Sequence, residues 1–346
     1  MRIVLVLVLL AALSLALPVV TWRTGHEAFA PLALEQVGAA RRLPQRVWID
    51  TDAACGEPGW HDPDDCLALL ALLGRPGIDV VGVSTVFGNA PAERTHRVAA
   101  EAVAQLRGGA VPVYRGCSAH FAECRSSDAV TALRAALAHG PLTILALGPV
   151  TNVARALGAA TADQRAAAEV VAVMGRRPGH RFHPSENRAP RAWLFGHGPV
   201  FRDLNAALDP EAVTALLALQ PRLTLVPYEA ARQVVLDERD LARISARDAA
   251  GAWTAARCRE WLARWRDRVG LDGFYPFDLV AAIYVLTPQR LDCAQVAVWV
   301  GRDPQLTIFD RAQAVLVTQG PVPQDRPVAS AARYCTAVHA RVGDVL

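Results

Sequence analysis

Short, continuous runs of Val, Ile and Leu alternate with longer segments of helical period along most of the chain. The runs predict strands at 46–50, 78–88, 111–116, 142–148 and 169–175, and the segments between them predict helices at 64–73, 91–109, 129–140 and 149–159. Strands that are apolar on both faces and alternate with helices are typical of a parallel sheet covered on both sides. The pattern therefore predicts an α/β fold with an open, mostly parallel sheet and helices on both faces.

The second half of the chain is less regular. Residues 176–200 show neither a strand nor a helix period, and a loop of that length in a compact domain is usually functional or mobile. Asp209, followed by proline and glutamate, is a good helix start. Residues 223–236 predict a further strand with a polar exit, and the segment 274–288 places Asp278 at the start of a last apolar helix.

Residues 240–268 are predicted to be helical and carry three tryptophans. Trp253, Trp261 and Trp265 are spaced eight and four residues apart, which places them on one helix face. We expect this face to pack in the core.

Polar residues follow several predicted strands at their carboxyl ends, which is where ligands bind in open α/β sheets. Asp50 and Asp52 end the first strand, and Asn89 follows the second. Neither a G-x-G-x-x-G nor a G-x-x-x-x-G-K-[ST] pattern follows any strand, which disfavours dinucleotide binding and P-loop chemistry.

Five aspartates lie within the sixteen residues 50–65, at the junction of a buried strand and an apolar helix. Like charges that close raise one another's pKa unless a positive group lies among them. Asp52, Asp64 and Asp65 are therefore candidate ligands of a hard cation such as Ca²⁺, which prefers oxygen ligands. The alternative is that the aspartates cap the following helix, although capping does not explain Asp50 and Asp52 at the strand end.

The first twenty-two residues differ from the rest. Residues 3–20 are apolar and carry no charge, which fits a secretory signal or a membrane anchor better than a buried helix. We therefore expect an export signal or N-terminal anchor at 1–22, a linker at 23–44 and one domain at 45–346. The protein would then be periplasmic, secreted or held at the membrane by its N-terminal helix.

Composition and cysteine content narrow the classes further. The chain has 346 residues, 52% hydrophobic residues and a net charge of +3, which argues against disorder and against nucleic-acid binding. Its seven cysteines include no C-x-x-C pair, so a zinc site is not expected. In an exported protein, bridges between Cys117 and Cys124 and between Cys55 and Cys66 are plausible, and one cysteine must stay unpaired.

Six motifs then point to a family. The chain contains, in order, DTDAAC…HDPDDCLAL, VSTVFGNAPAERT, LALGPVTNVARAL, VVAVMG, DLNAALDPEA and FDLVAAIYVLTP. Together they resemble the inosine-uridine-preferring nucleoside hydrolases over residues 47–288. The resemblance implies an open, mostly parallel sheet and calcium-dependent cleavage of the N-glycosidic bond of ribonucleosides.

The resemblance also implies roles for individual residues. Asp52, Asp65, Asp278 and the backbone carbonyl of Thr151 would bind calcium. Asp52 would in addition be the general base, and Asn89 would lie near the attacking water. Asp64 and Asn205 would bind the ribose, and Asp203 would also belong to the substrate-binding residues.

Four departures from the family pattern concern the substrate. Eleven residues separate the two aspartate pairs and bring Trp60 and His61 near the expected site. Phe277 stands where the family has its leaving-group histidine, so base stacking by Phe277 and Trp60 is one interpretation and a lost acid is another. Asp203 replaces a glutamate and His197 an asparagine, and His61 and His197 are the candidate replacement acids.

The sequence therefore predicts an exported, calcium-dependent nucleoside hydrolase that acts on a small-molecule nucleoside, with homo-oligomer formation left open. One alternative is a nucleoside- or sugar-binding protein of the same fold with little turnover. Another is a hydrolase of a related glycoside whose anionic group meets arginines of the 176–191 segment. Those arginines are Arg176, Arg177, Arg181, Arg188 and Arg191.

Overall fold

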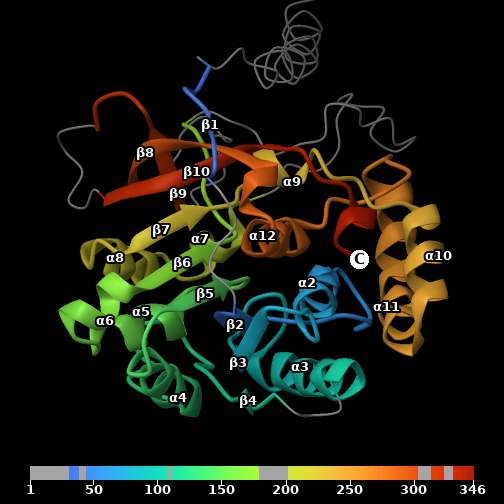
Figure 1. Cartoon of the computed structure of the whole chain (residues 1–346), viewed down its shortest axis with the longest axis horizontal. Coiled ribbons are helices and arrows are strands. Elements are labelled where there is room, and N and C mark those ends of the chain that lie inside the picture. The colour runs from blue at the N-terminus through green and yellow to red at the C-terminus, as the bar shows by residue number, and fades with distance from the viewer. Residues whose placement is uncertain (1–30, 39–43, 108–110, 179–201, 303–312, 323–329) are drawn as a thin grey trace, which may run out of the picture.

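One continuous sheet runs through the described part of the chain (Figure 1). The computed structural model describes residues 31–38, 44–107, 111–178, 202–302, 313–322 and 330–346. In sheet order the strands are β1 (Glu35–Gln36), β8 (Leu291–Arg302), β10 (Ser330–Val338), β7 (Arg222–Leu225), β6 (Ala168–Ala172), β5 (Leu142–Ala146), β2 (Gln45–Thr51), β3 (Ile78–Thr85) and β4 (Val113–Tyr114), and β9 (Gln313–Thr318) pairs with β8.

The sheet has a parallel part and an antiparallel end. Every neighbouring pair from β10 to β4 is parallel, whereas β8 runs antiparallel to β1, β9 and β10. The mostly parallel sheet predicted from the sequence is thus confirmed. Strand β1 lies within the segment expected to be a linker and pairs with β8 at the sheet edge.

Helices cover both faces of the sheet, as predicted. They are α2 (Asp64–Leu72), α3 (Ala92–Arg107), α4 (Asp128–Leu137), α5 (Thr151–Gly158), α6 (Ala162–Ala167), α7 (Leu204–Leu208), α8 (Pro210–Ala218), α9 (Tyr228–Ala231), α10 (Glu238–Arg247), α11 (Ala249–Arg268) and α12 (Phe277–Leu286). Helices α2, α3 and α9–α12 share one hydrophobic cluster, and α4, α5 and α8 share the other. Alternate residues of β2 enter opposite clusters, with Val47 and Ile49 in the first and Trp48 in the second.

The strand predicted at 223–236 was wrong in extent. Strand β7 ends at Leu225, two residues before Pro227, which has no N–H for a ladder and leads into α9. The stretch predicted to be helical at 240–268 is helical and is divided into two helices. Asp248 interrupts it in an extended conformation and caps α11 by accepting a hydrogen bond from Gly251 N at 2.7 Å.

Three disulfides join described cysteines. The pairs Cys55–Cys66 and Cys117–Cys124 were expected, and Cys293–Cys335 links directly opposed residues of β8 and β10. Cys258 is free and buried in α11, as the odd count requires. In the described ranges we find no helix with the length and apolar character to cross a membrane, and the segment 1–22 lies outside those ranges.

Candidate active site

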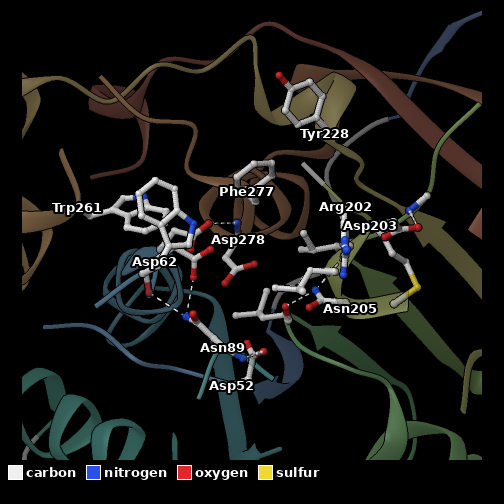
Figure 2. Close-up of a pocket in the computed structure, with 17 residues that line it drawn as sticks. Asp52, Asp62, Asn89, Arg202, Asp203, Asn205, Tyr228, Trp261, Phe277 and Asp278 are labelled. Carbon is white, nitrogen blue, oxygen red and sulfur yellow. Dashed lines mark hydrogen bonds between the residues drawn. The ribbon is translucent and has the colours of Figure 1, made fainter. Parts of the chain in front are cut away.

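A cavity of about 330 Å³ opens at the carboxyl ends of the parallel strands (Figure 2). Its walls come from the segments that follow β2, β3, β5 and β6 and from the starts of α7, α9 and α12. The described lining residues are Asp52, Trp60, Asp62, Asp64, Asn89, Leu147, Val173, Met174, Gly175, Arg202, Asp203, Leu204, Asn205, Tyr228, Trp261, Phe277 and Asp278. The polar groups thus meet at the carboxyl ends of the parallel strands, the edge of the sheet where the sequence predicted a ligand site.

Asp52 lies between two glycines that leave room for its carboxylate. A Cβ on Gly88 would lie 1.9 Å from Asp52 Oδ2, and a Cβ on Gly148 would lie 2.8 Å from Asp52 Cγ. Asp52 Oδ2 accepts a hydrogen bond from Asn89 N at 2.7 Å. The glycine positions therefore allow two strand-exit loops to close directly on this side chain.

Three further carboxylates gather at the start of α2. One oxygen of each of Asp62, Asp64 and Asp65 lies within 4.8 Å of the others. Asp64 Oδ2 accepts from Asp278 N at 2.9 Å, which ties the start of α2 to the start of α12. The residue before α2 is Pro63, which makes no side-chain cap, and Asp64 and Asp65 lie in the first turn of the helix.

The aspartates raise one another's pKa. Burial, and after it the charge of Asp64, raises the pKa of Asp65 to about 7. Burial also raises the pKa of Asp64 to about 6, against hydrogen bonds from the backbone. For Asp52, Asp62 and Asp278, burial and then the neighbouring carboxylates hold the pKa well above the usual range.

These groups fit a divalent cation. Asp65 Oδ1 accepts from the Thr51 hydroxyl, whereas Asp65 Oδ2 is buried without a hydrogen-bond partner. A buried carboxylate oxygen without a donor is unfavourable unless a positive charge meets it. A set of carboxylate oxygens with no nitrogen or sulfur donor suits a hard ion of the calcium or magnesium type.

Two acidic residues differ from expectation. Asp62, which was not among the candidate ligands predicted from the sequence, lines the cavity and joins the cluster. Asp50 is turned away from it, accepting from Ser84 Oγ at 2.5 Å and from Asn152 Nδ2 at 2.8 Å. Asp50 therefore ties β2 to β3 and α5.

The structure does not bring Thr151 to the cavity. Thr151 is fully buried in the first turn of α5, and its hydroxyl donates to Asp209 Oδ2 at 2.6 Å. Leu147, which directly follows β5, lines the cavity instead, and its carbonyl oxygen accepts from Asn205 Nδ2 at 2.7 Å. The loop after a parallel strand reaches the site before the helix does, which is why the motif position was misread.

Asn89 and Asn205 line the cavity and also donate hydrogen bonds to backbone carbonyl oxygens. Asn89 Nδ2 donates to Asp62 Oδ1 at 2.6 Å, so Asn89 joins Asp52 to the acidic cluster. Asn205 Nδ2 donates to the carbonyl oxygens of Leu147 and Val173, at 2.7 and 3.0 Å. Since both amide hydrogens of Asn205 are used, the group that it can offer a ligand is its oxygen.

Asp203 lines the cavity but serves the scaffold. Its Oδ2 accepts from Gly175 N at 3.1 Å and from Val315 N at 3.0 Å. Burial raises the pKa of Asp203 to about 6 against these two hydrogen bonds. This oxygen of Asp203 therefore faces the protein, and the substrate-binding role of Asp203 stays a prediction.

Aromatic rings form another wall. Trp60 is 47% exposed and meets Trp261 edge to face, with ring centroids 5.0 Å apart. Phe277, at the start of α12, lies 6.0 Å from Tyr228 between centroids. The expectation that the tryptophan face of α11 is only core holds for Trp265, which is fully buried, but Trp261 reaches the cavity.

Of the two candidate acids, only His61 lies within the described residues, and it does not line the cavity. Its Nδ1 lies 2.6 Å from the carbonyl oxygen of Asn89, so it donates there. His197 lies outside the described residues, as do Arg181, Arg188 and Arg191. Arg176 is buried beside β9 and Arg177 pairs with Glu229 at 2.9 Å.

Eight of the described lining residues were not predicted, namely Leu147, Val173, Met174, Gly175, Arg202, Leu204, Tyr228 and Trp261. Tyr228 and Arg202 lie in none of the six motifs, and Trp261 was assigned to the core. A signal was present for Trp261 in its helical spacing from the other two tryptophans. Arg202 directly precedes the DLN motif and could have been noticed by its position.

Comparison with known proteins agrees with this geometry. The sequence profile of the inosine-uridine preferring nucleoside hydrolases matches residues 47–340. The non-specific ribonucleoside hydrolase RihC of Escherichia coli strain SMS-3-5 is 26% identical over 273 residues, which are 71% of this chain and 80% of RihC.

Solved structures share the fold. A plant nucleoside hydrolase, the PpNRh1 enzyme, superposes with a TM-score of 0.67 at 19% identity, over 85% of this chain and 95% of its own. A purine-preferring ribonucleoside hydrolase from Gardnerella vaginalis gives 0.63 at 17% identity, over 85% and 94%. The profile match spans most of the chain, and we conclude that this protein belongs to the inosine-uridine preferring nucleoside hydrolase family, whose enzymes are N-glycosyl hydrolases.

Proposed function

We propose that the protein hydrolyses the N-glycosidic bond of ribonucleosides with the help of a calcium ion held by Asp52, Asp64, Asp65 and Asp278. The observation that carries this proposal is the convergence of buried carboxylates, one with an unpartnered oxygen, on one side of a cavity whose other walls are aromatic and polar. The family supports a hydrolase, and the all-oxygen donor set supports calcium.

A bound divalent cation would lower the pKa of a water molecule and orient the vicinal hydroxyls of a ribose. Asp52 would take the proton of the attacking water, a step typically worth about 10²–10⁴-fold in rate. The hydrogen bond from Asn89 N fixes the orientation of Asp52, and the neighbouring carboxylates stabilise positive charge that develops on the sugar. Asn205 would accept a hydrogen bond from a ribose hydroxyl.

The leaving base would lie against the aromatic wall. Trp60, Trp261 and Phe277 offer stacking surface, and Phe277 has no proton to give. Two tryptophans at the same end of the cavity suit the larger ring system of a purine. We therefore include purine preference in the proposal.

Export also belongs to the proposal. The apolar segment 3–20 and the three disulfides support it, because disulfides persist in oxidising compartments. Retention of the segment as a membrane anchor is a second form of the same proposal. Fractionation of cells that express the full chain, with and without residues 1–22, would test both forms.

The central test is a panel of purine and pyrimidine nucleosides assayed for release of reducing sugar. We expect release that stops on addition of a chelator, returns with calcium and is lost in Asp52→Asn. Asp79→Asn, on the exposed side of β3, is the matched control and should keep full activity. Release that survives both the chelator and Asp52→Asn would overturn the mechanism, and saturable nucleoside binding without release would indicate a binding protein.

A further inference from the structure

Asn89 connects Asp52 to the loop of residues 53–63, hereafter loop 53–63. The backbone N–H of Asn89 donates to Asp52 Oδ2 at 2.7 Å (Figure 2). Asn89 Nδ2 donates to the carbonyl oxygen and to Oδ1 of Asp62, at 3.0 and 2.6 Å. The carbonyl oxygen of Asn89 lies 2.6 Å from His61 Nδ1. Two adjacent residues of loop 53–63 therefore hold the residue whose N–H orients Asp52.

The contact between His61 and Asn89 has a fixed direction. A carbonyl oxygen can only accept, so His61 Nδ1 carries the hydrogen. The neutral ring with its hydrogen on Nδ1 and the protonated ring can both donate here, so the contact does not depend on the charge of His61. At the other side of the ring, a Cβ on Gly59 would lie 3.3 Å from Nε2. His61 thus lies between the backbone at Gly59 and the backbone at Asn89.

The segment that carries Asn89 depends on such contacts for its conformation. It runs from the end of β3 to the start of α3, as residues 86–91. Gly88, directly before Asn89, has a φ of +156°, and glycine has more conformational freedom to lose on folding than any other residue. Hydrogen bonds from outside the segment are therefore needed to keep the Asn89 N–H directed at Asp52, and His61 supplies one to the carbonyl of the same residue.

We propose that His61 is a positioning residue for the hydrolytic reaction, which acts through Asn89 on Asp52, the proposed general base. The inference rests on the proposed function and gives His61 a role other than that of leaving-group acid. A misplacement of about 1 Å at a reacting group can cost about 10²-fold in rate. Loss of the His61 hydrogen bond should therefore slow the chemical step, and it should affect substrate binding little because His61 does not line the cavity.

The kinetic test uses inosine and the calcium-supplemented full chain. His61→Ala should lower kcat by about 10- to 100-fold and change KM by less than about 3-fold. His61→Phe, which keeps a ring but has no donor, should behave in the same way. His61→Asn should keep kcat within about 3-fold of the wild type, because its Nδ2 can replace Nδ1 as donor to the Asn89 carbonyl but cannot protonate a leaving base.

His139 offers a matched control. Its Nδ1 lies 2.7 Å from the carbonyl oxygen of Ala135, so it makes the same kind of contact at an exposed position after α4. His139→Ala should change neither kcat nor KM. Calcium affinity, measured by calorimetry, should be the same in the wild type and in the variants of His61 and His139.

Three results would overturn the inference and leave the proposed function standing. The first is an unchanged kcat in both His61→Ala and His61→Phe. The second is an equal loss of kcat in His61→Asn and His61→Ala, which would indicate that His61 donates a proton. The third is a large loss of calcium affinity in His61→Ala, which would indicate damage to the acidic cluster as a whole.

Nuclear magnetic resonance decides the inference even if no nucleoside is hydrolysed, in which case the proposed function itself fails. The chain has four asparagines, of which only Asn89 follows a glycine, so ¹³C-carbonyl glycine combined with ¹⁵N-asparagine selects the backbone amide of Asn89. A hydrogen bond to a carboxylate is short and strong and moves the amide proton signal downfield. The signal should move upfield in His61→Ala and His61→Phe and return in His61→Asn. The same position in the wild type, His61→Ala and His61→Phe would overturn the inference.

Discussion

Replacement of Asp65 by asparagine should have opposite effects on the cation-free and the calcium-loaded protein. In the cation-free protein Asp65 is a buried carboxyl with one oxygen lacking a partner, and its pKa is raised to about 7 from an ordinary value of 3.8. A raised pKa in the folded state means that the stability is fully present below the unfolded pKa and is lost as the pH rises through the folded pKa. Ionised Asp65 therefore destabilises the cation-free protein above pH 7.

The size of the effect follows from the shift. A change from 3.8 to about 7 corresponds to about 4 kcal/mol of lost stability once the pH exceeds 7. Asparagine keeps an oxygen for the Thr51 hydroxyl but places an NH₂ group where Oδ2 has no partner, which costs about 1–3 kcal/mol. The net gain is about 1–3 kcal/mol, or roughly 2–10 °C in Tm for a domain of this size.

The assay is thermal unfolding by circular dichroism at pH 5 and pH 8, with a chelator and with calcium. At pH 8 without calcium, Asp65→Asn should unfold at a higher temperature than the wild type, and the advantage should shrink at pH 5. Calcium at about 100 times its Kd should stabilise the wild type by about 2.7 kcal/mol and the variant far less. An Asp65→Asn variant that is less stable than the wild type with chelator at pH 8, yet keeps the full stabilisation by calcium, would refute the assignment of Asp65 as a calcium ligand. Asp79→Asn, at an exposed position, serves as the control.

Three further predictions concern the surroundings of the cluster. Gly88→Ala should lower kcat by about 10²-fold or more while the protein stays folded. The added Cβ would lie 1.9 Å from Asp52 Oδ2 and displace Asp52, the proposed general base. Measurement of kcat and a circular dichroism spectrum check this prediction. Trp60→Ala should reduce kcat/KM for purine substrates by about 10-fold through the loss of stacking, and a loss that is no larger for purines than for pyrimidines would contradict a base-contacting role. The double variant Cys55→Ser/Cys66→Ser should lose about 3 kcal/mol of stability, measured by urea unfolding, because it opens a loop of 11 residues.

The sequence predicted the parallel half of the fold well because those strands are buried on both faces and read as continuous apolar runs. The antiparallel end was not assigned. In β8 buried and partly exposed residues are mixed, and its partners β9 and β10 come from separate segments. Pairing between distant segments leaves no local periodicity, so a single sequence shows the parts of this end but not their association.

The candidate site shows the same division. Asp52, Asp64 and Asp278 could be named because they stand in motifs and at element starts, and all three line the cavity. The prediction for Thr151 fell four residues beyond Leu147, which lines the cavity. A motif gives the order of residues but not which of their groups faces the cavity. Arg202 and Trp261 could not be assigned to the site from the sequence. Tertiary packing sets both the position of Arg202 after a long loop and the face that α11 turns toward the loop between Asp52 and Asp64.

The loop between Asp52 and Asp64 and the phenylalanine at position 277 bear on the same step of the proposed reaction, the departure of the base. The inserted loop is held by the Cys55–Cys66 disulfide and by ion pairs of Glu57 with Arg94 and Arg97, at 3.3 and 2.6 Å. The disulfide and the ion pairs keep Trp60 in contact with Trp261, although Trp60 is half exposed. A site that cannot protonate the base from position 277 can still lower the barrier by stacking on it, because a π surface stabilises the departing ring without a proton transfer. The loop therefore adds the stacking surface of Trp60 to that of Phe277 on α12. Because the disulfide and the ion pairs already order the loop, less conformational entropy is lost at Trp60 when a substrate binds.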